Sequence, residues 1–343
     1  MFLRLINIFG FWQFTFIAIQ FASAMRVVTY NLRFDSQPNN ITVQQSIDGL
    51  ADPLVQPTFQ RVTTEQPWST RRIRVADHLL SEGILVAGFQ EALVRQVKDL
   101  AELFGKEWSW VGVGRDDGIA AGEFSPIFFK NDVKLISNDS FWLSKNRNTP
   151  FEPSKFPGAG SFRVCTVAHF SLASGGTQRN FTLLNTHLDD QSDAQRRLGA
   201  SLLITRARFE AVRTNSPVLI TGDFNSPSTG TNSGAYNIIT GATPPVAINA
   251  TFAAKFAVGA NELPCFKMLD LRGQAPRRNV SANFATFTGF RVPNDTSQWT
   301  RIDFIFGGSN GGWTTQGYKV GTSLSDDGLL ASDHRPVFAD VSV

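Results

Sequence analysis

The stretch ITGDFNSP, residues 220–227, ends an apolar run with a glycine, an acid, an amide and a proline. The preceding residues SPVL extend this run into the short apolar pattern of a buried strand, which the proline stops. Because side chains alternate along a strand, Asp223 and Asn225 are expected on the same face. Two polar groups on one face at a strand end can bind a single ligand together.

Polar residues also interrupt or close other apolar segments of the chain. They are Asn31 in RVVTYN, Glu91 in ILVAGFQE, His187 in FTLLNTH, Asp303 in RIDFIF, and Asp333 and His334 before RPVFADVSV. Most of them have an ordinary explanation when taken alone, such as a turn residue or an acid at a helix start. Asp303 is harder to explain, because an unpaired carboxylate in so apolar a strand is costly. We expect it to pair with His334; a salt bridge to Arg301 or Arg335 is the alternative.

Taken together, these residues supply oxygen ligands, two imidazoles and an acid–amide pair, without a cysteine cluster. Oxygen ligands suit Mg²⁺ or Mn²⁺ better than a structural zinc. In phosphoester hydrolysis a divalent cation neutralises phosphate, a base orients the attacking water, and a protonated histidine stabilises the extra charge. The set therefore predicts metal-dependent phosphoester hydrolysis.

The composition of the chain supports a large core, since 42% of its 343 residues are hydrophobic. Strand and helix signals alternate over residues 25–343, without a repeat or a low-complexity linker. This pattern predicts an α/β fold with two packed sheets flanked by helices. The net charge of +3 permits a phosphate-rich substrate without requiring one.

The segment STRRIRVADHLLSEG is expected to form a helix with Ser69 as its N-cap and Gly83 as its stop. Its cluster of Arg71, Arg72 and Arg74 is interpreted as part of a solvated helix face.

Residues 1–24 have the features of a secretory signal peptide: a cation at Arg4, a long apolar run and an A-x-A site that ends at Ala24. They predict a secreted, extracellular mature chain of residues 25–343; an uncleaved membrane anchor is the alternative. In an oxidising compartment Cys165 and Cys265 could pair, and two separate thiols are the alternative.

The motifs TYNLR, FQE, NTHLDD, GDFNSP, RIDFIF and SDHRPV, in this order, resemble the endonuclease/exonuclease/phosphatase superfamily. This metal-dependent group includes deoxyribonuclease I, exonuclease III, inositol polyphosphate 5-phosphatases, neutral sphingomyelinases and deadenylases. Each motif alone is weak, but six in order are specific, and they cover residues 25–343. The resemblance implies a deoxyribonuclease I-like fold, a four-layer sandwich of two packed mixed β-sheets flanked by helices.

The resemblance also implies which residues bind metal. Asn31 and Glu91 match the metal-binding Asn and Glu of the family, and Asp333 matches an acid that reaches the metal.

Five further matches are implied to act on the phosphate. His187 matches the histidine that contacts phosphate, Asp223 the acid that orients the nucleophilic water, and Asn225 the amide that holds phosphate. Asp303 matches the acid that pairs with the terminal histidine, His334, which acts on the phosphate.

The segments GVGRDDGIAAGEFSPIFFK and RVCTVAHF resemble a poorly characterised microbial subgroup of this superfamily. In that subgroup, Arg115, Asp117, Glu123 and Arg163 match positions that line the substrate pocket. Arg163 is the best candidate for a phosphate ligand; a surface strand arginine is the alternative.

The chain departs from the subgroup at Thr288, where a histidine is expected, and at Val167, where a tryptophan is usual. Both departures bear on substrate preference and not on the metal set. The patterns W-x-G-D-x-N-x-R and C-D-R-I of the inositol 5-phosphatases are also missing, which argues against phosphoinositide specificity.

The sequence thus predicts a secreted Mg²⁺- or Mn²⁺-dependent phosphoester hydrolase that attacks phosphorus with water. Its substrate is a nucleic acid, a phospholipid head group or a small phosphoester, so nuclease, phosphatase, sphingomyelinase-like and inositol-phosphatase-like activities stay open. A noncatalytic binding protein on a degenerate hydrolase fold is the alternative. No obligate protein partner is evident, and a monomer is expected.

Overall fold

The structure is a computed structural model that describes residues 24–144, 151–174, 177–292 and 294–343. Residues 1–23 of the predicted signal peptide lie outside these ranges. In the described part of the chain, none of the helices combines the length and the apolar character needed to cross a membrane.

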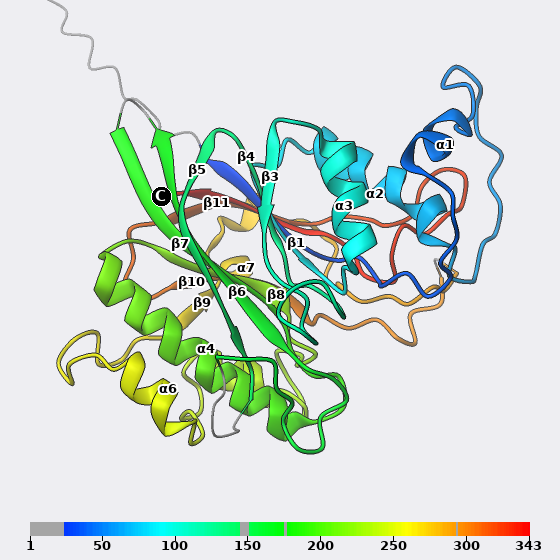
Figure 1. Ribbon diagram of the computed structural model, residues 1–343. Coiled ribbons are helices and arrows are strands. Elements are labelled where there is room, and N and C mark those ends of the chain that lie inside the picture. Colours follow the sequence, from blue (N-terminus) through cyan, green and yellow to red (C-terminus); the bar gives the residue numbers. More distant parts are fainter. Residues whose placement is uncertain (1–23, 145–150, 175–176, 293) are drawn as a thin grey trace, which may run out of the picture.

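The first of two mixed sheets carries both ends of the described chain. Its strands are β1 (Met25–Asn31), β2 (Val86–Gln90), β3 (Trp108–Val111), β4 (Ile127–Lys130), β11 (Thr314–Val320) and β12 (Val337–Ser342). They lie in the order β11-β12-β1-β2-β4-β3 (Figure 1). Strand β1 is parallel to β2, so Asn31 and Gln90 lie side by side where both strands end.

The second sheet brings three of the predicted site residues into one row. Its strands are β5 (Val133–Trp142), β6 (Val164–Ser174), β7 (Thr177–His187), β8 (Val218–Asp223), β9 (Met268–Asp270) and β10 (Asp303–Gly308), in the order β5-β6-β7-β8-β10-β9. The parallel pair β7 and β8 sets His187 beside Asp223. The antiparallel pair β8 and β10 sets Asp303 on the other side of Asp223.

The two sheets pack face to face over an apolar core to which Val27 and Ala339 contribute from one sheet and Leu183 and Leu219 from the other. Helices α1 (Val43–Asp48), α2 (Trp68–Ser81) and α3 (Val94–Phe104) lie on the side of the first sheet. Helices α4 (Asp193–Thr214), α5 (Gly234–Ile239) and α6 (Ala250–Lys255) lie on the side of the second, and α7 (Leu271–Gln274) and the 3₁₀ turn η1 (Arg277–Asn279) are short. Figure 1 shows α2 and α3 on one side of the strands and α4 and α6 on the other. The four-layer α/β sandwich is therefore confirmed.

A polar link joins the sheets near the strand ends. The fully buried amide of Asn185 donates to the carbonyls of Phe89 and Pro126, at 2.8 and 2.9 Å, and accepts from Gln90 Nε2 at 2.8 Å. Gly88 makes room for it, because a Cβ atom there would lie 2.5 Å from Asn185 Oδ1. Since all of these groups are buried, the link fixes how the two sheets are aligned.

Two expectations for helix α2 are wrong. Pro67 and not Ser69 occupies the N-cap position, since the helix begins at Trp68. Arg71 and Arg72 are fully buried rather than solvated. Arg71 Nη1 donates to the carbonyls of Leu32 and Ala331, so it ties the segments that follow β1 and precede β12 to the helix.

The two cysteines are separate free thiols, one buried and one exposed, so the alternative of a disulfide is wrong. Cys165 packs within β6 against the core under α4, and burial raises the pKa of its thiol well above the ordinary value.

Candidate active site

Asn31 connects the acids of the two sheets. Its Nδ2 donates to Glu91 Oε1 and to Asp223 Oδ2, both at 2.9 Å. Its Oδ1 accepts the backbone N–H of Arg33 at 2.9 Å, and this donor fixes which end of the amide faces the carboxylates. In this arrangement Asn31 positions two carboxylates, which is compatible with the implied place beside a metal without showing that it is a ligand.

Backbone strain gathers at this site. Five described residues other than glycine have positive φ angles, and three of them lie here: Arg33, Glu91 and Asn225, with angles of 56°, 59° and 45°. Hydrogen bonds hold two of them: Glu91 Oε2 accepts the N–H of Phe34 at 3.1 Å, and Asp223 Oδ1 accepts that of Asn225 at 2.9 Å. Because such backbone costs free energy, its presence at converging polar groups is typical of a functional site.

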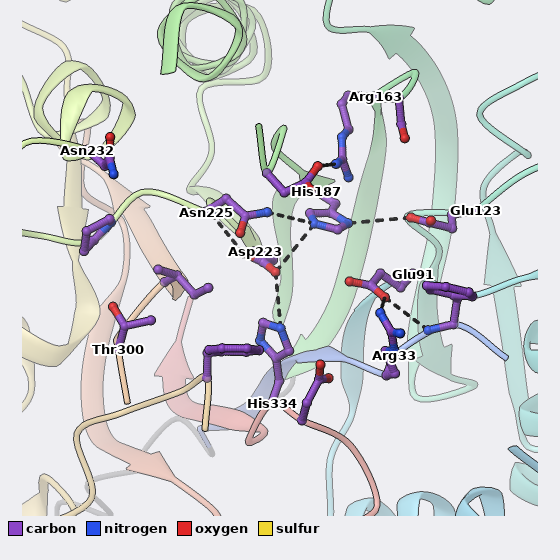
Figure 2. A pocket seen from close by; sticks show the side chains of 17 residues that line it. Arg33, Glu91, Glu123, Arg163, His187, Asp223, Asn225, Asn232, Thr300 and His334 are labelled. Atoms are coloured by element: carbon purple, nitrogen blue, oxygen red, sulfur yellow. Dashed lines mark hydrogen bonds and ion pairs between the residues drawn. The ribbon is translucent and has the colours of Figure 1, made fainter. Parts of the chain in front are cut away.

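The tautomer of His187 follows from its neighbours. The Asn225 amide donates to the carbonyl of Leu188 and contacts His187 Nε2, each at 3.1 Å, so the ring nitrogen accepts. The other ring nitrogen, Nδ1, has no hydrogen-bond partner among the described residues and lies 3.8 Å from Glu123 Oε2. Figure 2 shows the ring between Asn225 and Glu123. Nδ1 is therefore a donor that is free for a ligand.

The predicted pair of Asp303 and His334 is confirmed, with 2.9 Å between Asp303 Oδ2 and His334 Nδ1. The alternative of a salt bridge is wrong: Arg301 makes its ion pair with Asp270 at 2.7 Å, and Arg335 stacks on a tryptophan ring instead. Both members of the pair are buried, and His334 Nε2 lies 3.6 Å from Asp223 Oδ2.

The pKa values of the histidine of this pair and of a neighbouring acid are both raised. Burial opposes a charge on His334, but the attraction and hydrogen bond of Asp303 outweigh it and raise the pKa of His334 to about 10. Burial and the neighbouring carboxylate of Asp303 raise the pKa of Asp223. The site thus holds an imidazolium next to an acid that is a stronger base than usual.

Apart from Asn31 and Asp303, these residues line one cavity of about 660 Å³. The carboxylates of Glu91, Asp223 and Asp333 reach it from three different segments of the chain. Burial raises the pKa of Asp333, and repulsion by Glu91 adds to the effect. Such a concentration of hard oxygen atoms fits Mg²⁺ or Mn²⁺.

A second group has the composition of a metal site: Asp223, Asp303 and His334 offer ligand atoms within 4.8 Å of one another. Its histidine nitrogen Nδ1 is already committed to Asp303, however. Asp303 is therefore better described as the partner of His334 than as a cation ligand.

Arg163 lines the cavity and is 5% exposed, so the alternative of a surface strand arginine is wrong. Its Nη2 donates to Asp190 Oδ1 at 2.7 Å. Its buried Nη1 has no hydrogen-bond partner among the described residues, which leaves one donor for an anion, whereas Nε lies 3.6 Å from Asp189 Oδ2.

Of the other residues that were expected around the pocket, only some line the cavity. Glu123 lines the cavity, whereas Arg115 and Asp117 are not among its lining residues. Arg115 Nη1 donates to Glu123 Oε2 at 2.6 Å and so orients a side chain that does line it. Asp117 Oδ1 accepts three backbone N–H groups of its own loop. The backbone N–H of Thr288 donates to the backbone carbonyl of Asp333 at 2.9 Å.

Sequence reasoning missed part of the cavity wall. The further lining residues are Arg33, Phe34, Ser161, Asp190, Pro227, Asn232, Phe287, Thr300 and Ile302. Arg33 and Asp190 lie inside the motifs TYNLR and NTHLDD, which was a usable signal. Phe287, whose ring lies 4.9 Å from that of His334, comes from a loop-rich segment with no pattern that marks it.

Comparison with known proteins agrees with this geometry. The sequence model described as Endonuclease/Exonuclease/phosphatase family matches residues 28–334. An endonuclease/exonuclease/phosphatase structure from Bacteroides vulgatus is 26% identical, with a TM-score of 0.68 over 94% of this chain and 99% of that one. A mannosyl-6-phosphatase of Bacteroides thetaiotaomicron is 25% identical, with a TM-score of 0.65 over 93% and 100%.

More distant structures share the fold alone. D. rerio TDP2, complexed with a single-strand DNA product, is 14% identical, with a TM-score of 0.54 over 94% of this chain and 100% of that one. No curated protein sequence matches the chain significantly.

Proposed function

This chain belongs to the endonuclease/exonuclease/phosphatase family, and on that premise we propose that it is a Mg²⁺- or Mn²⁺-dependent phosphoester hydrolase. One observation carries the proposal: the residues that end or follow β2, β7 and β8 line a single cavity together with His334. Asn31 of β1 and Asp303 of β10 hold this set in place through hydrogen bonds. A degenerate binding protein would have no need for this buried and strained arrangement.

Glu91 and Asp333 would hold the cation, with Asn31 beside them. Burial works against the charge of Glu91, but the pKa of Glu91 is lowered, with the Asn31 hydrogen bond and the charge of His334 acting against burial. Glu91 is therefore ionised and ready to bind at neutral pH. When bound, the cation supplies the Lewis acidity that neutralises charge on the phosphate and the leaving oxygen.

The phosphate would lie between His187, Asn225, His334 and Arg163. The imidazolium of His334 and the free Nη1 of Arg163 stabilise the charge that develops on the phosphoryl oxygens. Asp223, whose pKa is raised, accepts a proton from the attacking water and orients it. His187 Nδ1–H, which faces the cavity, is placed to donate to the phosphate or the leaving oxygen.

The test is hydrolysis of p-nitrophenyl phosphate and of bis(p-nitrophenyl) phosphate by the purified chain of residues 25–343. Activity is expected with Mg²⁺ or Mn²⁺ and is expected to fall below one hundredth with EDTA. The ratio of the two rates also distinguishes a monoesterase from a diesterase. Full activity in EDTA would refute the cation dependence, and no hydrolysis of either ester would favour the noncatalytic alternative.

Glu91→Gln is expected to weaken Mg²⁺ binding by roughly 10- to 100-fold, because the variant keeps the hydrogen-bonding shape but loses the negative charge. Isothermal titration calorimetry with Mg²⁺ measures it. Glu102→Gln, at an exposed position of α3, is the matched control and should bind like the wild type. An unchanged affinity in Glu91→Gln would remove Glu91 from the ligand set.

We also propose that residues 1–24 direct secretion and are removed after Ala24. Arg4, the apolar run and the A-x-A site support this proposal. N-terminal sequencing of the protein recovered from the culture medium should begin at Met25. Retention of the intact chain in the membrane fraction would favour the anchor instead.

A further inference from the structure

The cavity has two chemically different ends (Figure 2). One end carries charge on all of its polar walls, through Arg33, Glu91, Glu123, Arg163, Asp190 and Asp333. The residues that line the other end are uncharged: Pro227, Asn232, Phe287, Thr300 and Ile302. Figure 2 shows Asn232 and Thr300 across Asn225, Asp223 and His334 from Arg33 and Glu91. We call these five uncharged residues the neutral subsite.

The neutral subsite is built on fixed backbone. Ser226 Oγ donates to the carbonyl of Asn232 at 2.7 Å, which closes the loop after β8. Phe287 and Thr300 exchange backbone hydrogen bonds of 3.0 and 3.1 Å. Since the Phe287 ring also packs against His334, the subsite adjoins the place where the phosphate would bind.

The subsite offers hydrogen-bonding groups next to an apolar surface. Neither the amide of Asn232 nor the hydroxyl of Thr300 has a hydrogen bond to another side chain or backbone group in the described part of the chain. Asn232 is exposed and Thr300 half-buried, so both are open to a ligand. Phe287, Pro227 and Ile302 present carbon atoms beside them.

Resting on the proposed function, we propose that the substrate is a phosphomonoester whose organic part is an uncharged, polyhydroxylated ring of the size of a hexose. The neutral subsite would bind that ring. The hydroxyl groups of the ring would form hydrogen bonds with Asn232 and Thr300, and one of its C–H faces would pack against Phe287. In hydrolysis the bond from the water oxygen to phosphorus forms as the ester P–O bond breaks. The departing sugar oxygen takes up a proton, and the products are the free sugar and inorganic phosphate.

The absence of charge in the neutral subsite is what selects this class. Nucleic-acid binding draws most of its affinity from phosphate contacts to Arg and Lys, and half or more of its hydrogen bonds reach phosphate or sugar. None of the five residues of the subsite provides a cation for a second phosphate. A nucleic acid chain or an inositol polyphosphate would therefore leave its further phosphates uncompensated there.

The test compares glucose 6-phosphate and mannose 6-phosphate with p-nitrophenyl phosphate, which has a flat neutral body without hydroxyl groups. In the double variant Asn232→Ala/Thr300→Val, kcat/KM for the better hexose phosphate is expected to fall 10- to 100-fold, since two hydrogen bonds are lost. For p-nitrophenyl phosphate it should stay within about twofold. Asn294→Ala/Thr296→Val, at exposed positions that do not line the cavity, is the matched control.

Equal losses for both esters, or no loss for the hexose phosphates, would overturn the subsite. So would a wild-type kcat/KM for a DNA oligonucleotide or an inositol polyphosphate above that for both hexose phosphates. If the wild type hydrolyses no ester, the proposed function fails on its own account. Calorimetric titration with the two hexose phosphates then decides the subsite: binding that the double variant weakens at least tenfold supports it, and unaltered or undetectable binding overturns it.

Discussion

Asp223→Asn is expected to lower kcat by roughly 10³-fold and to leave KM within about threefold, because loss of a positioned proton acceptor typically costs 10²- to 10⁴-fold. Asp223 is 1% exposed, and its pKa is raised by burial and by Asp303. The asparagine has the same shape but accepts no proton from water. The loss is therefore felt in the transition state and hardly in substrate binding.

Steady-state kinetics on p-nitrophenyl phosphate at saturating Mg²⁺ measures this loss. Asp132→Asn, at a side chain 62% exposed, controls for the loss of an acid and should behave like the wild type. Circular dichroism should show that the Asp223 variant is folded. A rise in KM with an unaltered kcat would make Asp223 a binding residue and refute the role given to it.

The candidate site could be found in the sequence because its residues close apolar strands. A strand that ends in a polar residue is visible as a local pattern, and Asp223 and His187 each follow it. Asp303, which begins β10, is visible instead as an acid in an apolar segment. The register then places the three side by side on neighbouring strands, where parallel and antiparallel pairing meet. The need of a buried carboxylate for a partner was enough to predict the hydrogen bond to His334.

Contacts between residues that are far apart in the sequence could not be predicted in this way. Arg71 and Arg72 have the spacing and charge of a solvated helix face, but they are buried because backbone carbonyls of distant segments need donors. Nothing in RRIR distinguishes the two situations, since the acceptors lie elsewhere in the chain. They are at Leu32 and Ala331 for Arg71, and at Ile41 and Asp99 for Arg72. The Ser69 cap failed for a related reason: Pro67 presets the backbone that starts the helix, and no side-chain cap is used.

The neutral end of the cavity was also not predictable, for a different reason. Its residues come from loops between residues 226 and 302, where no strand or helix periodicity indicates which side chains point into the cavity. Backbone pairing between Phe287 and Thr300, not a side-chain pattern, brings them together. The proposed neutral subsite of this chain therefore lies in loop segments whose sequence gives little structural signal.

Asp303→Asn is expected to lower kcat by on the order of 10³- to 10⁴-fold at pH 8, the loss seen when a carboxylate that orients a catalytic histidine becomes an amide. Asp303 is the largest influence that favours charge on His334, and without it burial dominates and the pKa of His334 falls. The wild-type ring is charged at pH 8 because its pKa is about 10, whereas the variant ring is neutral. Asp303 is thus a positioning residue that acts through His334.

The pH dependence distinguishes this role from a purely structural one. The ratio of wild-type to variant kcat should shrink as the pH falls from 8 to 6, where the variant ring regains its proton. The stability that the wild-type pair contributes is fully present below about pH 6.5, the ordinary histidine pKa, and is lost as the pH rises through about 10. The Tm of the wild type should therefore drop more than that of the variant between pH 7 and pH 10.

Arg335→Gln provides the control, because Arg335 belongs to the same segment but stacks on Trp299 and makes no pair with Asp303. Its kcat should stay within about threefold of the wild type at every pH. A ratio for Asp303→Asn that is large but constant from pH 6 to pH 8 would mean that the carboxylate only holds the ring in place. A ratio near one would remove His334 from the chemistry, since the 2.9 Å hydrogen bond would then serve the fold alone.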